Sequence, residues 1–214
     1  MIVLYICIME VVMEFLLMIL GLLLGGIMFS DFIPRHFKQT DLKVVSDDLN
    51  PGTFKAFNHC GIKIGIICFT LDFMKGFVPV FLASLFLKPD NIYFSLIMMA
   101  PVLGHAIGIF NRGNGGKCIA TTFGVLFGIL PLSLVVFLLA DFYIVLAIIF
   151  RHNLFRCSIL TFVSFAFLSS ILMYNDSPFL VYGILLITMI VIFRHYYMAY
   201  VKKNMKVCDG EANG

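Results

Sequence analysis

The residues best suited to chemistry in this 214-residue chain are glycines that precede a lysine within residues 104–117. Gly113, Gly115 and Gly116 stand just before Lys117, and glycines allow the backbone to approach an anion closely. The helix expected to follow would add unpaired N–H groups at its first turn. The segment therefore predicts a phosphate-sized site. A flexible interhelical turn that carries a basic residue is the alternative interpretation.

This glycine segment is not a Walker A phosphate-binding loop. That loop requires glycine at position 111 and serine or threonine at position 118, whereas this chain has Asn111 and Cys118. Any anion site here must therefore be of another kind.

A pair of opposite charges lies inside an apolar stretch that predicts a helix over Ile64–Leu87. Asp72 and Lys75 are three positions apart, so on a helix they share one face and can form a local ion pair. Ionisable groups at membrane depth are costly and usually face a protein interior or a wet cavity. We expect the pair either to support a polar site or to fix the packing of helices.

Two histidines lie near the expected ends of apolar segments. His105 belongs to the segment Tyr93–Phe110, and His195 follows Arg194 where the last apolar segment ends. Each imidazole could donate to a phosphate or move a proton. A purely interfacial histidine is the alternative in both cases.

Several classes of function lack the residues that they need. The six cysteines are scattered without a Cys-x-x-Cys pair, and neither Gly-x-Ser-x-Gly nor His-Glu-x-x-His occurs, so we expect no metal, no cofactor and no nucleophilic hydrolase centre. A net charge of +3 without a dense basic stripe also disfavours nucleic acid as a partner.

The composition indicates that membrane-spanning helices must position these residues. Hydrophobic residues make up 61% of the chain and charged residues only 13%, which leaves too little polar surface for a water-soluble globule. Glu10 and Glu14 interrupt the first apolar segment, so its dependable part is Phe15–Phe29. The other clear segments are Ile64–Leu87, Tyr93–Phe110, Cys157–Tyr174 and Pro178–Phe193.

The stretch Ile119–Phe150 is long for one span and short for two. It contains Pro131 and Asp141. We expect Asp141 to lie in an exposed interhelical turn. Two spans place nearly all of the 15 basic residues on one side of the membrane, with Lys88 alone on the other and Lys75 inside a span. The basic-rich side is cytoplasmic by the positive-inside rule. The residues on that side are Arg35, Lys38, Lys43, Lys55, Lys63, Arg112, Lys117, Arg151, Arg156, Arg194, Lys202, Lys203 and Lys206.

The predicted fold class is therefore all-α, a polytopic membrane protein with about seven transmembrane helices, its N-terminus outside and its C-terminus cytoplasmic. We expect a single domain over residues 1–214, cytoplasmic loops at 30–63 and 111–118, and a cytoplasmic tail at 202–214.

In order and spacing, these residues resemble the bacterial membrane family of acyl-phosphate:glycerol-3-phosphate acyltransferases. The resemblance extends over about residues 25–195. It rests on Asn50-Pro51-Gly52, Gly61-x-Lys63-x-Gly65, Asp72-x-x-Lys75-Gly76-x-x-Pro79, Gly104-His105, Phe110, Gly115-Gly116-Lys117, Ala120-Thr121 and Arg194-His195.

The resemblance implies acyl transfer from an acyl phosphate to the sn-1 hydroxyl of glycerol 3-phosphate, giving lysophosphatidic acid and phosphate. It implies a multi-pass protein of the bacterial inner membrane whose partners are these two substrates and membrane lipid. Lys117 and His195 would be catalytic, and Asp72 and Lys75 would give structural support. The substrate-binding residues that it implies are Ser46, Asn50, Gly52, His105, Gly115, Gly116, Thr121 and Arg194.

The chain departs from the family pattern at two places that bear on function. Asp47, Asp48 and Leu49 replace a Gly-Ser-Gly run in the first loop, and Cys118 replaces the glycine after the lysine. An alternative function is therefore a catalytically degenerate member that binds a phosphorylated ligand, a lipid or a protein partner. A small transporter is a weaker alternative, because the sequence shows no internal repeat.

Overall fold

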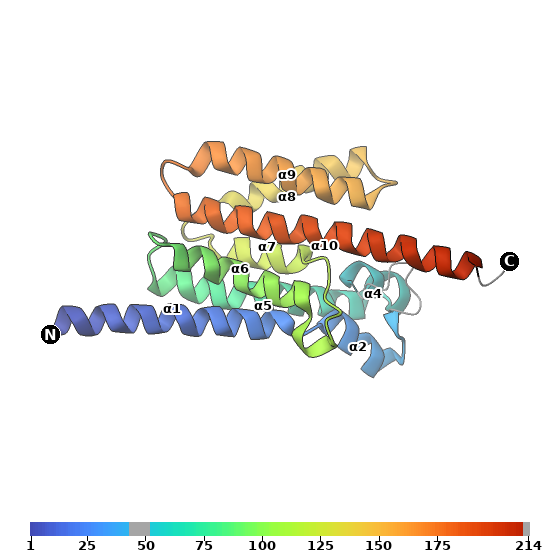
Figure 1. Cartoon of the computed structure of the whole chain (residues 1–214), viewed down its shortest axis with the longest axis horizontal. Helices are drawn as coiled ribbons and strands as arrows, with labels where there is room; N and C mark the ends of the chain where they lie inside the picture. Colours follow the sequence, from blue (N-terminus) through green and yellow to red (C-terminus); the bar gives the residue numbers. More distant parts are fainter. Residues whose placement is uncertain (43–51, 212–214) are drawn as a thin grey trace.

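The computed structural model describes residues 1–42 and 52–211, and the regular structure in these ranges is entirely helical (Figure 1). A 3-10 turn, η1 (Ile109–Asn111), links two of the helices. The α-helices are α1 (Ile2–Gly26), α2 (Phe29–Lys38), α4 (Thr53–Cys60), α5 (Ile62–Phe86), α6 (Ile92–Ile107), α7 (Ile119–Gly128), α8 (Val135–Ile149), α9 (Leu154–Met173) and α10 (Pro178–Glu211).

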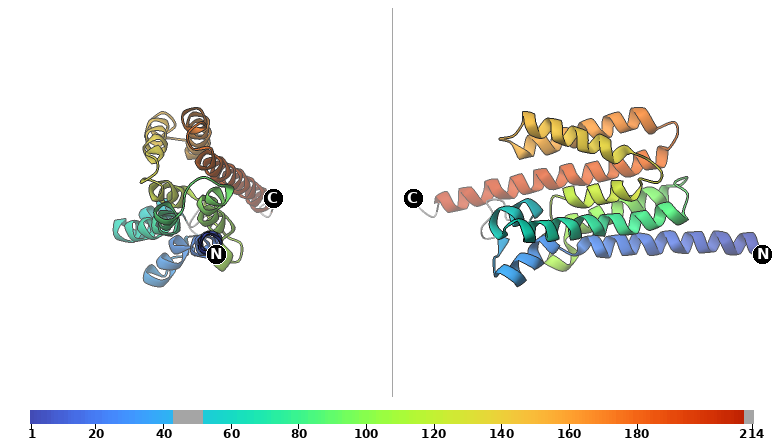
Figure 2. Two further views of the ribbon diagram at one scale, coloured as in Figure 1. Left: turned by 90° about the vertical axis from the view of Figure 1, so that its left-hand side faces the viewer. Right: turned by 180° about the vertical axis from the view of Figure 1, so that it is seen from behind.

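The long helices lie side by side in an elongated bundle (Figure 1). Helix α1 packs on α6, α5 packs on α7, and α6 packs on α10, while α8 and α9 form a hairpin on the outer side of α10 (Figure 2). The short helices α2 and α4 stand at the end of the bundle where α10 extends toward the C-terminus (Figure 1). The core is made of buried side chains such as Phe94, Leu126, Phe162 and Ile184.

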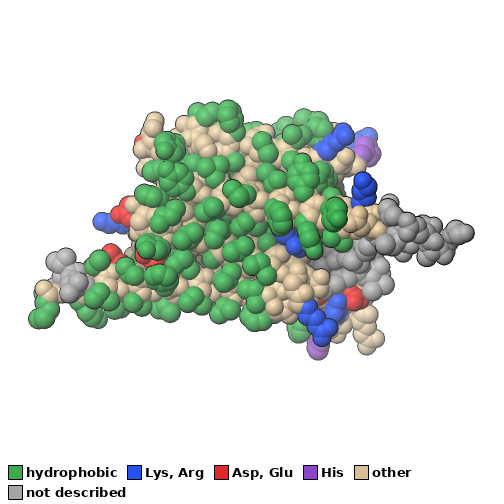
Figure 3. All heavy atoms as spheres, in the orientation of Figure 1, with side chains coloured by type: hydrophobic (Ala, Val, Ile, Leu, Met, Phe, Trp, Pro, Cys, Tyr) green, Lys and Arg blue, Asp and Glu red, His purple; other side chains and the backbone are tan. Residues whose placement is uncertain are grey.

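Five of the described helices are long and apolar enough to cross a membrane, and two more, Ile119–Gly128 and Val135–Ile149, are apolar but shorter. On the face seen in Figure 3, hydrophobic side chains cover most of the middle, and most charged ones lie toward the two ends. The long candidate spans are Cys7–Gly26, Ile62–Phe86, Ile92–Asn111, Leu154–Met173 and Pro178–Val201. The predicted all-helical class is confirmed.

Helix α1 corrects the prediction for the first segment, because it continues through Glu10 and Glu14. The Glu14 side chain is 4% exposed, and its Oε1 accepts a hydrogen bond from Asn91 Nδ2 at 2.7 Å. Asn91 also caps α6, since its side-chain oxygen accepts from the Phe94 N–H. A partner distant in sequence therefore satisfies the carboxylate that was expected to interrupt the helix.

The ambiguous stretch Ile119–Phe150 forms two helices, α7 and α8, separated by a turn that contains Pro131. Proline lacks an N–H donor and clashes with the preceding helical turn, which agrees with the break. The expectation of an interhelical turn at Asp141 is wrong, because this residue lies within α8, where its side chain is exposed.

Helix α10 is longer than predicted, because it extends through Arg194 and His195 to Glu211. The predicted span ended at Phe193, and residues 202–214 were expected to form a cytoplasmic tail. The described part of that segment, up to Glu211, is helical and continues α10.

Close contacts at glycine fix how the helices approach one another. A Cβ on Gly76 of α5 would collide with the Thr121 carbonyl oxygen of α7, and one on Gly124 of α7 would collide with the Phe73 carbonyl oxygen of α5. The two backbones therefore touch directly, as small residues at membrane helix interfaces allow. This contact sets the position of the first turn of α7 beside Asp72 and Lys75.

Candidate active site

The glycine segment forms a tight loop between α6 and α7. Gly108 and Gly113 have φ angles of 67° and 78°, in the left-handed region that favours glycine. A Cβ on Gly115 would meet the His105 and Ala106 carbonyl oxygens, and one on Gly116 would meet the His105 ring. The loop therefore lies against the last turn of α6, where the Gly116 N–H donates to the His105 carbonyl oxygen at 3.0 Å.

Arg194 reaches this loop from α10. Its Nη2 donates to the Gly115 carbonyl oxygen at 2.6 Å, and its Nε lies 3.3 Å from the Gly116 carbonyl oxygen. The guanidinium carbon also lies 5.1 Å from the centroid of the Tyr197 ring, and the residue is 8% exposed. The arginine is thus buried between the loop and its own helix.

His195 is the next residue of α10 and is 3% exposed. Its Nδ1 lies 2.8 Å from the Val191 carbonyl oxygen. A carbonyl oxygen only accepts hydrogen bonds, so Nδ1 carries a proton, and Nε2 is the basic nitrogen whenever the ring is neutral. The imidazole is therefore oriented in the manner that a general base or a phosphate ligand requires.

Lys117 is partly buried and lies two residues before α7 begins at Ile119. The first N–H groups of α7 have no carbonyl partner within that helix, and the helix dipole favours negative charge at this end. Cys118 lies between Lys117 and the first residue of α7, and its φ of 66° is left-handed. Burial raises the pKa of its thiol to about 12. The buried, neutral thiol contacts the Gly116 and Val102 carbonyl oxygens at 3.5 Å.

Asp72 and Lys75 form the predicted ion pair, with 2.8 Å between Asp72 Oδ1 and Lys75 Nζ. Lys75 Nζ also donates to the Ile27 carbonyl oxygen at the end of α1, at 2.6 Å. Asp72 Oδ2 accepts from Thr53 Oγ1 at the start of α4, at 3.3 Å. The pair therefore connects α5 with the end of α1, which precedes the first predicted cytoplasmic loop, and with α4, which lies within that loop.

Among the described residues around the loop, the buried charges do not cancel. Lys75 and Arg194 are cationic, and Asp72 is their buried anionic neighbour. His105 interacts electrostatically with both cations, which places the three groups in one cluster. An uncompensated buried charge is costly, so this end of the bundle suits an anionic ligand.

The remaining predicted site residues take different positions. Gly52 precedes α4 and is half-buried. His105 Nδ1 and Thr121 Oγ1 are both buried and make no hydrogen bond within the described structure. Ser46 and Asn50 lie outside the described residues. The structure thus brings Gly115, Gly116, His105 and Arg194 into direct contact.

Three contributors to this region were not predicted from the sequence: the Ile27 carbonyl oxygen, the Thr53 hydroxyl and the Tyr197 ring. Tyr197 follows Arg194 by three positions, and on a helix this spacing could have indicated that the two side chains touch. The other two lie far from their partners along the chain, so no local pattern pointed to them.

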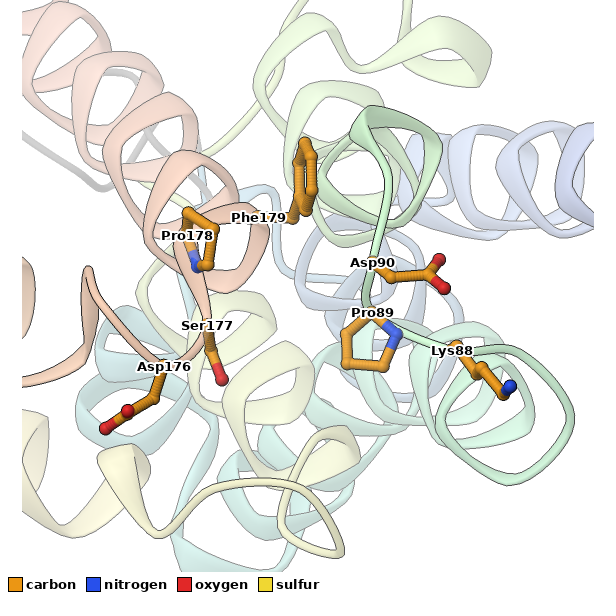
Figure 4. Close-up of a pocket in the computed structure, with 7 residues that line it drawn as sticks. All are labelled: Lys88, Pro89, Asp90, Asp176, Ser177, Pro178 and Phe179. Carbon is orange, nitrogen blue, oxygen red and sulfur yellow. The ribbon is translucent and has the colours of Figure 1, made fainter.

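A depression of about 470 Å³ lies between the α5–α6 and α9–α10 turns (Figure 4). It is lined by Lys88, Pro89, Asp90, Asp176, Ser177, Pro178 and Phe179. The charged side chains in it point in different directions (Figure 4). These turns lie at the opposite end of the bundle from the glycine loop, and the depression does not form part of the candidate site.

Two solved structures have a similar fold. A crystal structure of PlsY (YgiH), an integral membrane glycerol 3-phosphate acyltransferase in its glycerol 3-phosphate form, matches with a TM-score of 0.77 and 28% identity. The match covers 86% of this chain and 88% of that chain. The lysophosphatidic acid form of PlsY matches with a TM-score of 0.70 and 27% identity over 85% and 87% of the two chains.

Similar sequences carry the same description. A glycerol-3-phosphate acyltransferase of Hydrogenobaculum sp. (strain Y04AAS1) is 34% identical over 161 residues, which is 75% of each chain. One from Thermotoga petrophila is 42% identical over 109 residues, 51% of this chain and 55% of the relative. The model of the glycerol-3-phosphate acyltransferase family matches residues 15–199. The chain therefore belongs to the glycerol-3-phosphate acyltransferase family.

Proposed function

We propose that the protein transfers an acyl group from an acyl phosphate to the sn-1 hydroxyl of glycerol 3-phosphate. The products are lysophosphatidic acid and inorganic phosphate. The observation that carries this proposal is that, in the described part of the chain, buried cations outnumber buried anions beneath the glycine loop, at the point where α7 begins. Such a place suits a reaction in which both substrates and both products carry phosphate.

The reaction joins the glycerol oxygen to the acyl carbonyl carbon and breaks the bond from that carbon to the phosphate oxygen. The hydroxyl proton must leave as the new ester forms, and the departing phosphate keeps the electron pair of the broken bond. Negative charge develops on the carbonyl oxygen and on the leaving phosphate. Preorganised cations and N–H donors lower the barrier by stabilising that charge and by aligning the two substrates.

We assign the roles of the side chains from the family resemblance and, for the described residues, from their positions as well. Lys117 neutralises substrate phosphate beside the first turn of α7, and the backbone of Gly115 and Gly116 shapes the surrounding space. His195 accepts the hydroxyl proton at Nε2 when its ring is neutral, and its protonated form donates from Nε2 to the glycerol phosphate. Ser46, Asn50, Gly52, His105, Thr121 and Arg194 complete the substrate site, while Asp72 and Lys75 support it.

In this proposal the chain is one domain over residues 1–214, with seven membrane spans, an external N-terminus and a cytoplasmic C-terminus, in the inner membrane of a bacterial cell. Loops 30–63 and 111–118 and the end of the chain face the cytoplasm, where most basic residues lie. Five long and two shorter apolar helices support this count. Tyr182 and Tyr200 of α10 would be about 27 Å apart along a helix, close to the thickness of a hydrocarbon core of about 30 Å.

The test is acyl transfer by the purified full-length chain in detergent or proteoliposomes. The protein receives palmitoyl phosphate and radiolabelled glycerol 3-phosphate, and lysophosphatidic acid is separated by chromatography. We expect labelled product, and none when acyl-coenzyme A replaces the acyl phosphate. If folded protein makes no product under conditions in which a related acyltransferase is active, the proposal is wrong.

A catalytically degenerate binding protein is the second candidate, and Cys118 favours it. A left-handed φ of 66° at a non-glycine residue next to Lys117 is unusual. Restoring glycine and serine at positions 47–49, together with Cys118→Gly, separates the two candidates. Activity that appears only in the repaired protein would support degeneration, whereas equal activity in both proteins would support the enzyme.

A further inference from the structure

Arg194 engages the glycine loop through two consecutive peptide groups. Its Nη2 donates to the Gly115 carbonyl oxygen at 2.6 Å, and its Nε approaches the Gly116 carbonyl oxygen at 3.3 Å. Both donors belong to one rigid, planar guanidinium group. The two carbonyl groups therefore face the same side of the loop.

That arrangement determines where the associated N–H groups point. In a trans peptide the C=O and N–H bonds point in opposite directions. The N–H paired with the Gly115 carbonyl is that of Gly116, and it points back to the His105 carbonyl oxygen at 3.0 Å. The N–H paired with the Gly116 carbonyl is that of Lys117, and it points away from the guanidinium.

Without this constraint, glycine peptides can rotate easily and could turn carbonyl oxygens toward a bound anion. Carbonyl oxygens repel phosphate, whereas N–H groups attract it. The orientation of the two peptides therefore decides whether the start of α7 attracts or repels a phosphate. Arg194 is also 8% exposed and lies against the Tyr197 ring, so its own position is well defined.

We propose that Arg194 is a positioning residue: it holds the Gly115 and Gly116 carbonyls away from the substrate so that the start of α7 stays receptive to phosphate. The identity of the anion in this inference rests on the proposed function. The claim that Arg194 keeps the loop ordered does not depend on that function. It replaces the expectation that the Arg194 side chain binds substrate directly, because Nη2 and Nε are engaged by the loop.

Cys118 provides a report on loop order that requires no turnover. Its side chain is almost fully buried, and its Sγ contacts the same Gly116 carbonyl oxygen that Arg194 approaches. If the loop opens, the thiol becomes accessible to an alkylating reagent. Cys157 of α9 is also buried, and it lies outside this loop, so it reports unfolding of the bundle instead.

The experiment compares Arg194→Lys with the wild type, in the full-length protein without substrate. Lysine keeps the positive charge, but its single ammonium group lacks the planar fork that matches two carbonyls. N-ethylmaleimide labelling of each cysteine is followed over time by peptide mass spectrometry. We expect Cys118 to label about 10- to 100-fold faster in the variant, as loss of charge-assisted hydrogen bonds to the loop implies, while Cys157 stays protected.

Arg156→Lys is the matched control. Arg156 lies in the first turn of α9 with an exposed side chain, so its replacement should leave Cys118 protected and turnover unchanged. Lys117→Ala removes a charge next to Cys118 without touching the arginine, and it should also leave Cys118 protected.

Kinetics provide the second arm. If Arg194 orders the loop, Arg194→Lys should lower kcat as well as kcat/KM, with kcat/KM falling about 100-fold for both substrates. A selective rise in the KM for glycerol 3-phosphate, with kcat and Cys118 protection unchanged, would identify Arg194 as a direct ligand and overturn the proposal.

The labelling arm is decisive even if the wild type shows no acyl transfer. Continued protection of Cys118 in Arg194→Lys would overturn the positioning role. Equal exposure of Cys118 and Cys157 would show that Arg194 maintains the whole bundle rather than the loop. That result would also overturn the positioning role. Selective exposure of Cys118 supports the inference whether or not the acyltransferase assay succeeds.

Discussion

Lys75 Nζ donates a hydrogen bond to the carbonyl oxygen of Ile27 at 2.6 Å, so the middle of α5 is fastened to the end of α1. The same ammonium group pairs with Asp72, which in turn accepts from Thr53 at the start of α4. A single buried ion pair therefore holds α5 to the residue that precedes the first predicted cytoplasmic loop and to a helix within that loop.

Removing either partner of this pair should destabilise the protein. Lys75→Met leaves the Asp72 carboxylate buried without its cation, and breaking a buried pair in this way costs about 3–5 kcal/mol. Unfolding by sodium dodecyl sulfate, followed by circular dichroism at the helix band, measures the loss. The double variant Asp72→Asn with Lys75→Met should recover part of it, because neither charge remains. Lys88→Met at an exposed turn is the control, and a Lys75→Met variant as stable as this control would contradict the prediction.

Lys117→Ala should lower kcat/KM for acyl transfer by at least about 100-fold, the order expected when a charge that stabilises the transition state is lost. Lys88→Ala, at the opposite end of the bundle, should retain wild-type turnover. Both are measured by formation of radiolabelled lysophosphatidic acid. Equal rates for the two variants would remove Lys117 from the site.

Cys118 should reverse the usual order of stability between alanine and glycine. Its φ of 66° disfavours every residue with a Cβ, by about 1–2 kcal/mol in the left-handed region. Cys118→Gly should therefore unfold at a higher temperature than Cys118→Ala. At Cys68, inside α5, the order should be normal, with glycine less stable than alanine by about 1 kcal/mol. The same order at both positions would mean that residue 118 is not held in this conformation.

The thiol of Cys118 should also resist alkylation in the folded protein. Burial raises its pKa from 9.0 to about 12, so the neutral form persists well above physiological pH and the reactive thiolate is scarce. The pKa returns toward its ordinary value on unfolding, so stability linked to this group is present below pH 9 and is lost as the pH rises toward 12. At pH 8, iodoacetamide should label Cys118 more than about 1000-fold faster in denatured protein. Similar rates in native and denatured protein would contradict the assigned burial.

The proposed topology places two exposed turns on opposite sides of the membrane. In a background with Cys7→Ser and Cys208→Ser, Asn114→Cys should react with an impermeant maleimide only in inside-out vesicles. Asn175→Cys should react only in intact spheroplasts. Labelling of both positions from one side would contradict the seven-span arrangement.

Local patterns predicted much of this molecule, and contacts between distant residues account for most of what they missed. The three-residue spacing of Asp72 and Lys75 was enough to predict their ion pair. The uninterrupted α1 was missed because Asn91, the partner of Glu14, lies 77 positions away. The Arg194 contact with Gly115 has a sequence separation of 79 residues, so the sequence pointed to both residues without showing that they touch.

The backbone conformation at Cys118 shows a second kind of limit. Left-handed φ values are typical of glycine and sometimes of asparagine or aspartate, and cysteine gives no such signal. At this position the packing of α7 on α5 and the contacts of the loop overrule the local preference.

Arg194 and His195 occupy successive positions of α10. The peptide bond fixes the distance between their Cα atoms, and the continuous helix fixes the angle between their side chains at about 100°, whatever happens to the contacts between helices. When the bundle flexes, the group that holds the glycine loop and the imidazole move as one body. Thermal motion of the membrane can thus displace the reaction site as a whole without misaligning these two parts.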